Sequence, residues 1–325
     1  MTLMQAAVRV GMAIALCALA LSPSPSLSQT WPQRPVKLIL PLGPGSGADI
    51  SARLFAERLA ARWGQSVVVE NRPGADGVVA INAFINAADD HTLLFGPSSS
   101  FVGHPYTLEK MSYDPRELAP IAKISNTVVS IAAPGSMNVG SLKDLIGAVR
   151  AEPGKLNWAT ITGVTDIIVA GYAKSAGLEM NKIPYRDTVQ ALTDLGESRI
   201  HFYIAALAIT QAQARAGRIK LLAVTNRERA PSWPDLPTAA EAGVPELSFD
   251  GLVGLYGPRT MAADLRDRIA ADVQAVAADP AIAGRLTATG QLVPPGSAAE
   301  FAAAIDEQAK QLAAFAKTLG IQAKQ

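Results

Sequence analysis

A glycine-rich loop near the start of the chain has the residues best suited to bind a ligand. An apolar run at residues 36–40 is followed by Pro41-Leu-Gly-Pro-Gly-Ser-Gly-Ala-Asp49, which opens a helical pattern. In such a loop several backbone N–H groups and the positive end of a helix dipole face one point, which favours a carboxylate or a phosphate. Asp49 is better suited to cap the helix than to contact the ligand, because a carboxylate beside a bound anion costs energy. The loop predicts the ligand-binding residues Leu42, Gly43, Gly45, Ser46, Gly47 and Asp49.

The order of strand, polar loop and helix recurs along the chain. It recurs at residues 67–77, and at residues 156–165, where hydroxyls replace glycines. Three serines follow the apolar run at residues 92–95, and Tyr185 ends another strand, where it lines the ligand cleft or packs at a hinge. Ligands of open α/β sheets bind at the carboxyl ends of strands. These loops predict the ligand-binding residues Ser98, Ser99, Thr160, Thr162, Gly163, Thr165 and Tyr185.

The sequence indicates a binding protein better than an enzyme. Cys17 is the only cysteine, the three histidines are far apart, and neither a P-loop nor a Gly-x-Ser-x-Gly motif occurs. We therefore predict no catalytic residues, no metal site and no cofactor. An alternative is a nicotinamide dinucleotide enzyme, because Gly43-x-Gly45-x-x-Ala48 follows a strand and precedes Glu70, although Pro44 is unusual in that fingerprint.

The first residues have the pattern of a secretory signal peptide. Arg9 precedes an apolar run at residues 10–21, and a segment rich in serine and proline follows. The run is shorter than the about 20 residues that cross a bilayer. We expect cleavage after Ser28 and a soluble periplasmic protein.

Apolar strand patterns alternate with helical patterns along most of the chain, which is typical of parallel sheets with helices between the strands. Strands are expected at residues 36–40, 66–70, 92–95, 128–132, 156–159, 181–184, 200–203, 221–224 and 251–256. Helices are expected at residues 49–63, 77–87, 141–151, 166–176, 188–196, 205–216, 262–278, 281–287 and 298–320.

Breaks near residues 120–127 and 229–245 divide the mature chain into two lobes. An outer lobe of residues 29–126 and 241–325 surrounds an inserted lobe of residues 127–240, and we expect the ligand between them, at the hinge. With 29 basic and 28 acidic residues and 6% aromatic residues, the chain lacks the basic stripe and the stacking surface that nucleic acid requires.

Several motifs occur together in a characteristic order. They are Trp31-Pro-Gln-Arg-Pro-Val36, the glycine loop to Asp49, Val69-Glu-Asn-Arg-Pro-Gly-Ala-Asp-Gly77, Tyr113-Asp-Pro115, Pro153-Gly-Lys-Leu156, Pro184-Tyr185, Leu222-Ala-Val-Thr225 and Leu236-Pro-Thr-Ala-Ala-Glu-Ala-Gly-Val-Pro245. In these motifs the chain resembles the Bug-type receptors of tripartite tricarboxylate transporters, from Trp31 almost to the C-terminus. The resemblance implies a type II-like periplasmic binding protein fold of two lobes, which closes on a carboxylate-containing solute. The implied partners are membrane transporter subunits, or a sensor kinase in a signalling role, and the receptor is expected to be a monomer.

The chain departs from this family in the second half of the expected pocket. The family pattern Gly-x-Gly-Ser-x-x-His becomes Thr162-Gly-Val-Thr-Asp-Ile-Ile168, and Tyr-Lys-Gly becomes Tyr185-Arg186-Asp187. A family aspartate at the end of the following strand becomes Ala205. These positions add Val164, Asp166, Asp187 and Ala205 to the expected ligand contacts. The two aspartates either cap helices or repel a second carboxylate unless Arg186 turns inward.

Overall fold

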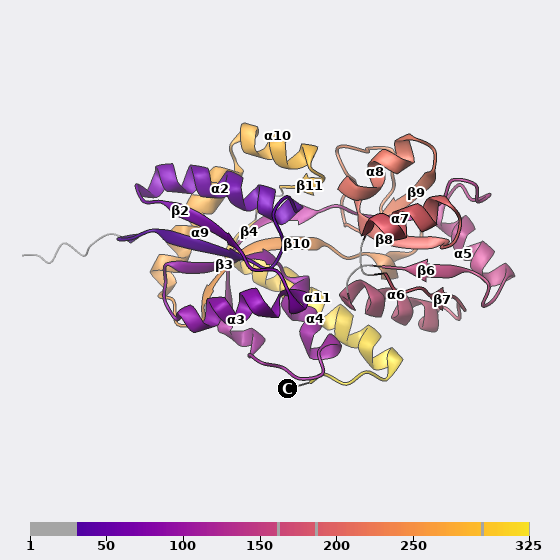
Figure 1. Ribbon diagram of the computed structural model, residues 1–325, viewed down its shortest axis with the longest axis horizontal. Coiled ribbons are helices and arrows are strands. Elements are labelled where there is room, and N and C mark those ends of the chain that lie inside the picture. The colour runs from indigo at the N-terminus through magenta and orange to yellow at the C-terminus, as the bar shows by residue number, and fades with distance from the viewer. Residues whose placement is uncertain (1–30, 161–162, 186–187, 294–295, 325) are drawn as a thin grey trace, which may run out of the picture. The chain divides into compact units, whose positions relative to one another are not determined.

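The computed structural model describes residues 31–160, 163–185, 188–293 and 296–324, and their strands form two sheets (Figure 1). Within the described residues the first sheet has the strand order β11-β4-β10-β3-β1-β2. Its strands are β1 (Val36–Leu40), β2 (Val67–Asn71), β3 (Thr92–Pro97), β4 (Leu118–Thr127), β10 (Gly251–Pro258) and β11 (Gln291–Leu292). The second sheet has the order β7-β6-β8-β5-β9. Its strands are β5 (Val129–Pro134), β6 (Asn157–Ala159), β7 (Asn181–Lys182), β8 (Phe202–Ala206) and β9 (Ile219–Val224).

Helices cover both sheets. Those around the first sheet are α2 (Gly47–Trp63), α3 (Val78–Ala87), α4 (Ser99–Thr107), α9 (Ala263–Ala277), α10 (Pro280–Ala288) and α11 (Ala298–Leu319). Those around the second sheet are α5 (Leu142–Ala151), α6 (Gly163–Ser175), α7 (Thr188–Gly196) and α8 (Leu207–Arg215). Short 3-10 turns occur at η1 (Ala75–Gly77), η2 (Pro115–Glu117) and η3 (Pro245–Leu247). No helix in these described segments is long and apolar enough to cross a membrane.

Local signals explain where several helices begin and end. The Ser46 hydroxyl accepts a hydrogen bond from the Asp49 N–H (3.2 Å) at the start of α2, and Gly64 ends the helix at φ +65°. Ser297 and Glu300 form a capping box at the start of α11. Each bond satisfies a backbone group that the helix itself leaves unpaired. Most expected elements are present with ends that differ by a few residues.

Both sheets are mixed, which corrects the expectation of mostly parallel sheets. In the first sheet β1 is parallel to β2 and β3, whereas β10 is antiparallel to both β3 and β4. In the second sheet β6 is parallel to β7 and β8, whereas β5 is antiparallel to β8 and β9. The antiparallel strands β4, β5, β9 and β10 adjoin the two places where the chain passes between the sheets. The alternation of strands and helices gives no information about that connectivity.

Residues 120–127, where we expected a break between the lobes, form most of β4. Val128 alone separates β4 from β5, so the chain passes from one sheet to the other in nearly continuous extended structure. The local sequence around Pro120 is typical of a loop, but pairing with β10 and β11 makes it a strand. Residues 34–325 form one compact unit, and the exact limits of the two lobes remain a prediction.

The C-terminal helix α11 packs against elements of both sheets. Near its start Phe301 covers Gly254 of β10, where an added Cβ would lie 2.0 Å from the Phe301 ring. Near its end Phe315 covers Gly171 of α6, where an added Cβ would lie 2.6 Å from Phe315 Cβ. Glycine at each position lets the helix approach closely. The apolar side chains of α11 therefore connect the first sheet to the helices of the second.

Candidate functional site

The loops that join strands to helices bring several helix N-termini to one region. In the first sheet the parallel strands β1 and β3 lead into α2 and α4. In the second sheet the parallel strands β6 and β8 lead into α6 and α8. Parallel strands end at the same sheet edge, so the starts of these helices are neighbours within each sheet. The N–H groups of first helical turns favour anions.

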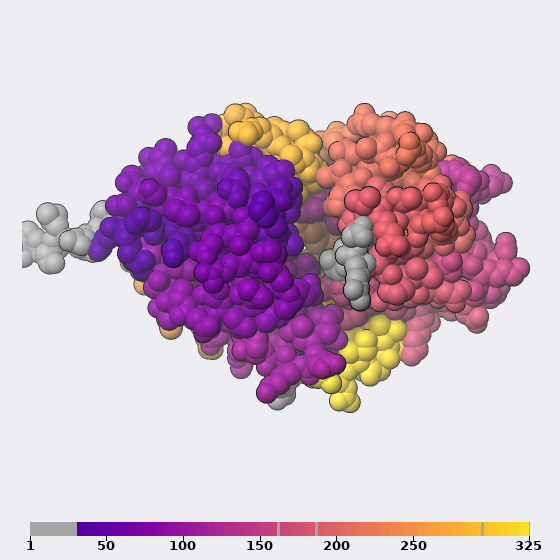
Figure 2. All heavy atoms as spheres, in the orientation of Figure 1, coloured from indigo at the N-terminus to yellow at the C-terminus, as the bar shows by residue number. Residues whose placement is uncertain are grey.

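A cavity of about 700 Å³ lies between these loops. Residues from the starts of α2, α4, α6, α7 and α8 line it, together with parts of β10, β11 and α11. Figure 2 shows a hollow between the indigo-to-purple surface and the red surface of the molecule. The volume is within the range typical of small-molecule sites.

The glycine loop lies at the cavity, but the Asp49 carboxylate accepts a hydrogen bond from the loop itself. Its carboxylate accepts hydrogen bonds from the Gly45 N–H (2.9 Å), Arg53 Nε (3.1 Å) and Asn71 Nδ2 (2.9 Å). Burial acts to raise the pKa of Asp49, but these hydrogen bonds outweigh it and hold the pKa below its usual value. Asp49 is outside the lining, and the Gly45 N–H that we expected to face a ligand donates to Asp49 instead.

Gly47 and Gln291 form the polar floor of the cavity. An added Cβ on Gly47 would lie 2.7 Å from Gln291 Nε2, so the two residues are in close contact. Gln291 Oε1 accepts hydrogen bonds from Ser125 Oγ and Thr127 Oγ1, both at 3.0 Å. These bonds fix the amide with its NH₂ group towards Gly47, where the first turn of α2 begins. A ligand carboxylate at this point would find N–H donors from α2 and from Gln291.

Of the three serines at residues 98–100, one has a structural role and two lie at the cavity. The buried Ser98 hydroxyl donates to Gln308 Oε1 (2.6 Å), so Ser98 connects the start of α4 to α11. The next two serines, Ser99 and Ser100, line the cavity. They belong to the first turn of α4, a helix that the sequence patterns did not predict.

Neither Asp166 nor Tyr185 is a lining residue in the structure. The Asp166 carboxylate accepts from Thr160 Oγ1 and from Lys182 Nζ, the latter at 2.5 Å. The Tyr185 hydroxyl donates to Asp194 (2.7 Å), and burial together with this bond raises the pKa of Tyr185 to about 12. Asp166 and Tyr185 therefore each have hydrogen-bond partners outside the cavity.

The predicted contacts therefore separate into three groups. Lining residues among them are Leu42, Gly45, Ser46, Gly47, Ser99, Val164, Thr165 and Ala205. Those outside the lining are Gly43, Asp49, Ser98, Thr160, Gly163, Asp166 and Tyr185. Thr162 and Asp187 are outside the described residues. Sequence reasoning missed Gln291, because a glutamine in a two-residue strand carries no recognisable signal.

The charged residues of the lining are acidic. Asp76 and Asp250 belong to it, and the described lining residues include no lysine, arginine or histidine. Burial raises the pKa of Asp76. Asp250 accepts a hydrogen bond from Asn126 Nδ2 (2.8 Å), which ties it to β4. No group of three or more residues suited to hold a metal occurs in the described segments.

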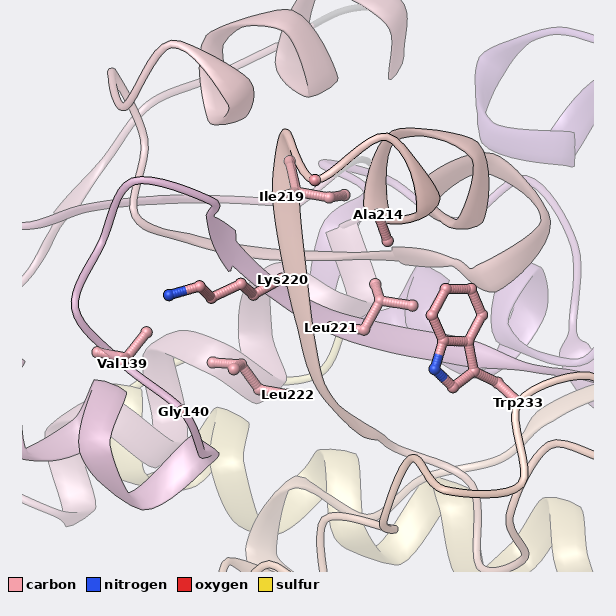
Figure 3. A pocket seen from close by; sticks show the side chains of 9 residues that line it. Val139, Gly140, Ala214, Ile219, Lys220, Leu221, Leu222 and Trp233 are labelled. Atoms are coloured by element: carbon pink, nitrogen blue, oxygen red, sulfur yellow. The ribbon is translucent and has the colours of Figure 1, made fainter.

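A second hollow, of about 450 Å³, lies along the edge strand β9. Figure 3 shows Leu221, Ala214 and Trp233 to one side of this strand and Lys220 extending to the other. Lys220 Nζ donates to the Met137 carbonyl (2.7 Å). This hollow lacks the converging helix N-termini, so we assign the ligand site to the larger cavity.

Known proteins resemble the chain over most of its length. A family model described as the tripartite tricarboxylate transporter family receptor matches residues 51–321. A UPF0065 protein of Bordetella bronchiseptica is 30% identical over 305 residues, which cover 93% of this chain and 91% of that protein. Two solved structures of similar fold contain carboxylates.

The first is the R. palustris protein Rpa4515 with adipate, at 28% identity and a TM-score of 0.76, covering 90% of this chain and 99% of that one. The second is MatC (Rpa3494) from Rhodopseudomonas palustris with bound malate, at 25% identity and a TM-score of 0.70, covering 87% and 100%. These findings confirm the two-lobed periplasmic binding protein fold expected from the motifs. The chain belongs to the receptor family of the tripartite tricarboxylate transporters, whose members are periplasmic solute-binding proteins.

Proposed function

We propose that the protein captures a small carboxylate-containing solute in the 700 Å³ cavity and delivers it to the membrane subunits of a transporter. The observation that carries this proposal is the polar floor, where the first turn of α2 meets the fixed amide of Gln291. A carboxylate there accepts from N–H donors that are already in place, so few groups need to be ordered on binding.

The comparisons support the carboxylate as the recognised group. Adipate and malate, the molecules named with the two similar structures, are both dicarboxylates with a short carbon chain. The contacts of Glu70 do not favour the alternative of a dinucleotide-binding enzyme. Glu70, which that alternative needs for a ribose, accepts from Arg72 Nε at 2.6 Å.

The remaining parts of the proposal concern the whole chain. The outer lobe of residues 29–126 and 241–325 and the inserted lobe of residues 127–240 close on the solute, and the receptor acts as a monomer. The signal peptide directs export and is removed after Ser28. N-terminal sequencing of the periplasmic form should begin near Gln29, and a form that keeps Met1 would refute this part.

A thermal-shift panel tests the carboxylate proposal. It compares monocarboxylates, dicarboxylates and tricarboxylates with amides of the same carbon skeleton, such as adipate with adipamide. At 100 times its dissociation constant, a ligand stabilises the protein by about 2.7 kcal/mol. We expect at least one acid to stabilise the protein while its amide does not. A panel in which no acid is distinguished from its amide would refute the proposal.

A further inference from the structure

The two sides of the cavity differ in polarity. On the side of the first sheet the lining includes Ser46, Ser99, Ser100, Gln291 and Gln308. On the side of the second sheet the described lining is aliphatic apart from two threonines, and its larger side chains are Val129, Val164, Ile168, Ile204 and Ile209. The first-sheet side also has apolar residues, such as Leu42, Ile50 and Val253, so the two sides differ in where most of the polar side chains lie.

Lys182, on β7 of the second sheet, is already paired. Lys182 Nζ binds Asp166 at 2.5 Å and lies 5.8 Å from the centre of the Trp158 ring. Neither Lys182 nor Asp166 is a lining residue. A second carboxylate at this end would meet the first turns of α6 and α7 but, among the described lining residues, no cationic side chain to compensate for the water that it loses.

The acidic residues of the lining also oppose a second anion. Asp250 accepts from Asn126 and lies 3.8 Å from Arg227 Nε, on the side of the cavity formed by β10, and Asp76 is in η1, which precedes α3. In its ionised form each carboxylate repels a dianion more strongly than a monoanion, and the Arg227 guanidinium offsets part of this repulsion at Asp250.

We infer that the solute is a monocarboxylate with an extended apolar body. This inference rests on the proposed function. The single carboxylate binds the first turn of α2 and the Gln291 amide, and the apolar body packs on Val164, Ile168, Ile204 and Ile209. Each buried methylene should raise the affinity about fourfold.

Titration calorimetry with two acids of equal length tests the inference. Hexanoate and adipate have the same carbon skeleton, and adipate has a second carboxylate in place of the terminal methyl group. We expect hexanoate to bind at least tenfold more tightly. Equal affinities, or tighter binding of adipate, would overturn the inference and leave the carboxylate proposal intact. If neither acid binds, the inference is also overturned, and the proposed function is judged by the wider panel.

A charge placed on the aliphatic side gives a second measurement. Ile209 lines the cavity and is 41% exposed, so Ile209→Lys keeps its ammonium group in contact with water. We expect this variant to shift the affinity ratio towards adipate by at least tenfold. Val68→Lys is the control, because Val68 is 48% exposed on the edge strand β2 and is outside the lining. An unchanged ratio in Ile209→Lys, or an equal shift in both variants, would overturn the assignment of the apolar side.

Discussion

A single methyl group at Gly47 should block the carboxylate site. In Gly47→Ala the new Cβ would lie 2.7 Å from Gln291 Nε2, closer than real Cβ contacts allow. The glutamine cannot move freely, because Ser125 and Thr127 both donate to its Oε1. The amide must therefore leave its position, or the start of α2 must shift.

The size of the effect follows from the hydrogen bond that is lost. A hydrogen bond to a charged group contributes about 1.5–3 kcal/mol, so affinity for a carboxylate should fall roughly 10- to 100-fold. Titration calorimetry with the best acid from the panel measures the loss. Gln291→Glu is a second variant, because it keeps the acceptor for both hydroxyls but replaces the NH₂ donor with an anionic oxygen.

The matched control is Gly43→Ala in the same loop. An added Cβ on Gly43 meets no atom within 4 Å, and Gly43 is outside the lining. We expect this variant to bind like the native protein. Equal affinities of Gly47→Ala and Gly43→Ala would refute the role of the Gly47 and Gln291 contact. Normal carboxylate binding by Gln291→Glu would refute the role of the amide.

Three further predictions concern stability. Asp49→Asn should lower the free energy of unfolding at pH 7 by roughly 1–3 kcal/mol. Because the folded pKa of Asp49 is depressed below 3.8, the difference from the native protein should vanish as pH falls through the folded pKa, and a constant difference in urea titrations would contradict this. Burial lowers the pKa of His104 below 6.5, so stability should fall as pH drops below about 6.5, by at most about 1.4 kcal/mol per pH unit. His104→Gln should reduce that slope, and an unchanged slope of unfolding free energy against pH would contradict the prediction. Gly103→Ala places a Cβ 2.2 Å from Val164, whereas Gly147→Ala in α5 meets nothing, so Gly103→Ala should be at least about 1 kcal/mol less stable than Gly147→Ala by chemical denaturation; equal stabilities would show that α4 and α6 separate easily.

Local features of the sequence determined the glycine loop, the helix that follows it and most other elements. Gly64 ends α2 as a C-cap, and Ser46 caps its start in place of the expected Asp49, whose N–H donates to the Ser46 hydroxyl; such capping depends on neighbouring residues alone. The ordered motifs determined the family for the same reason, because each is a short segment whose residues are adjacent in the chain. The family model confirms that assignment over residues 51–321.

Only the tertiary structure decided which residues meet at the cavity. Gln291 joins the site because β11 pairs with β4, which brings it beside Ser125, a residue 166 positions away in the chain. Asp49 is withdrawn from the site because Asn71 of β2 and Arg53 lie within reach of its carboxylate. Capping and periodicity act over a few residues, whereas strand pairing and side-chain contacts depend on the whole fold, so no local pattern contains them.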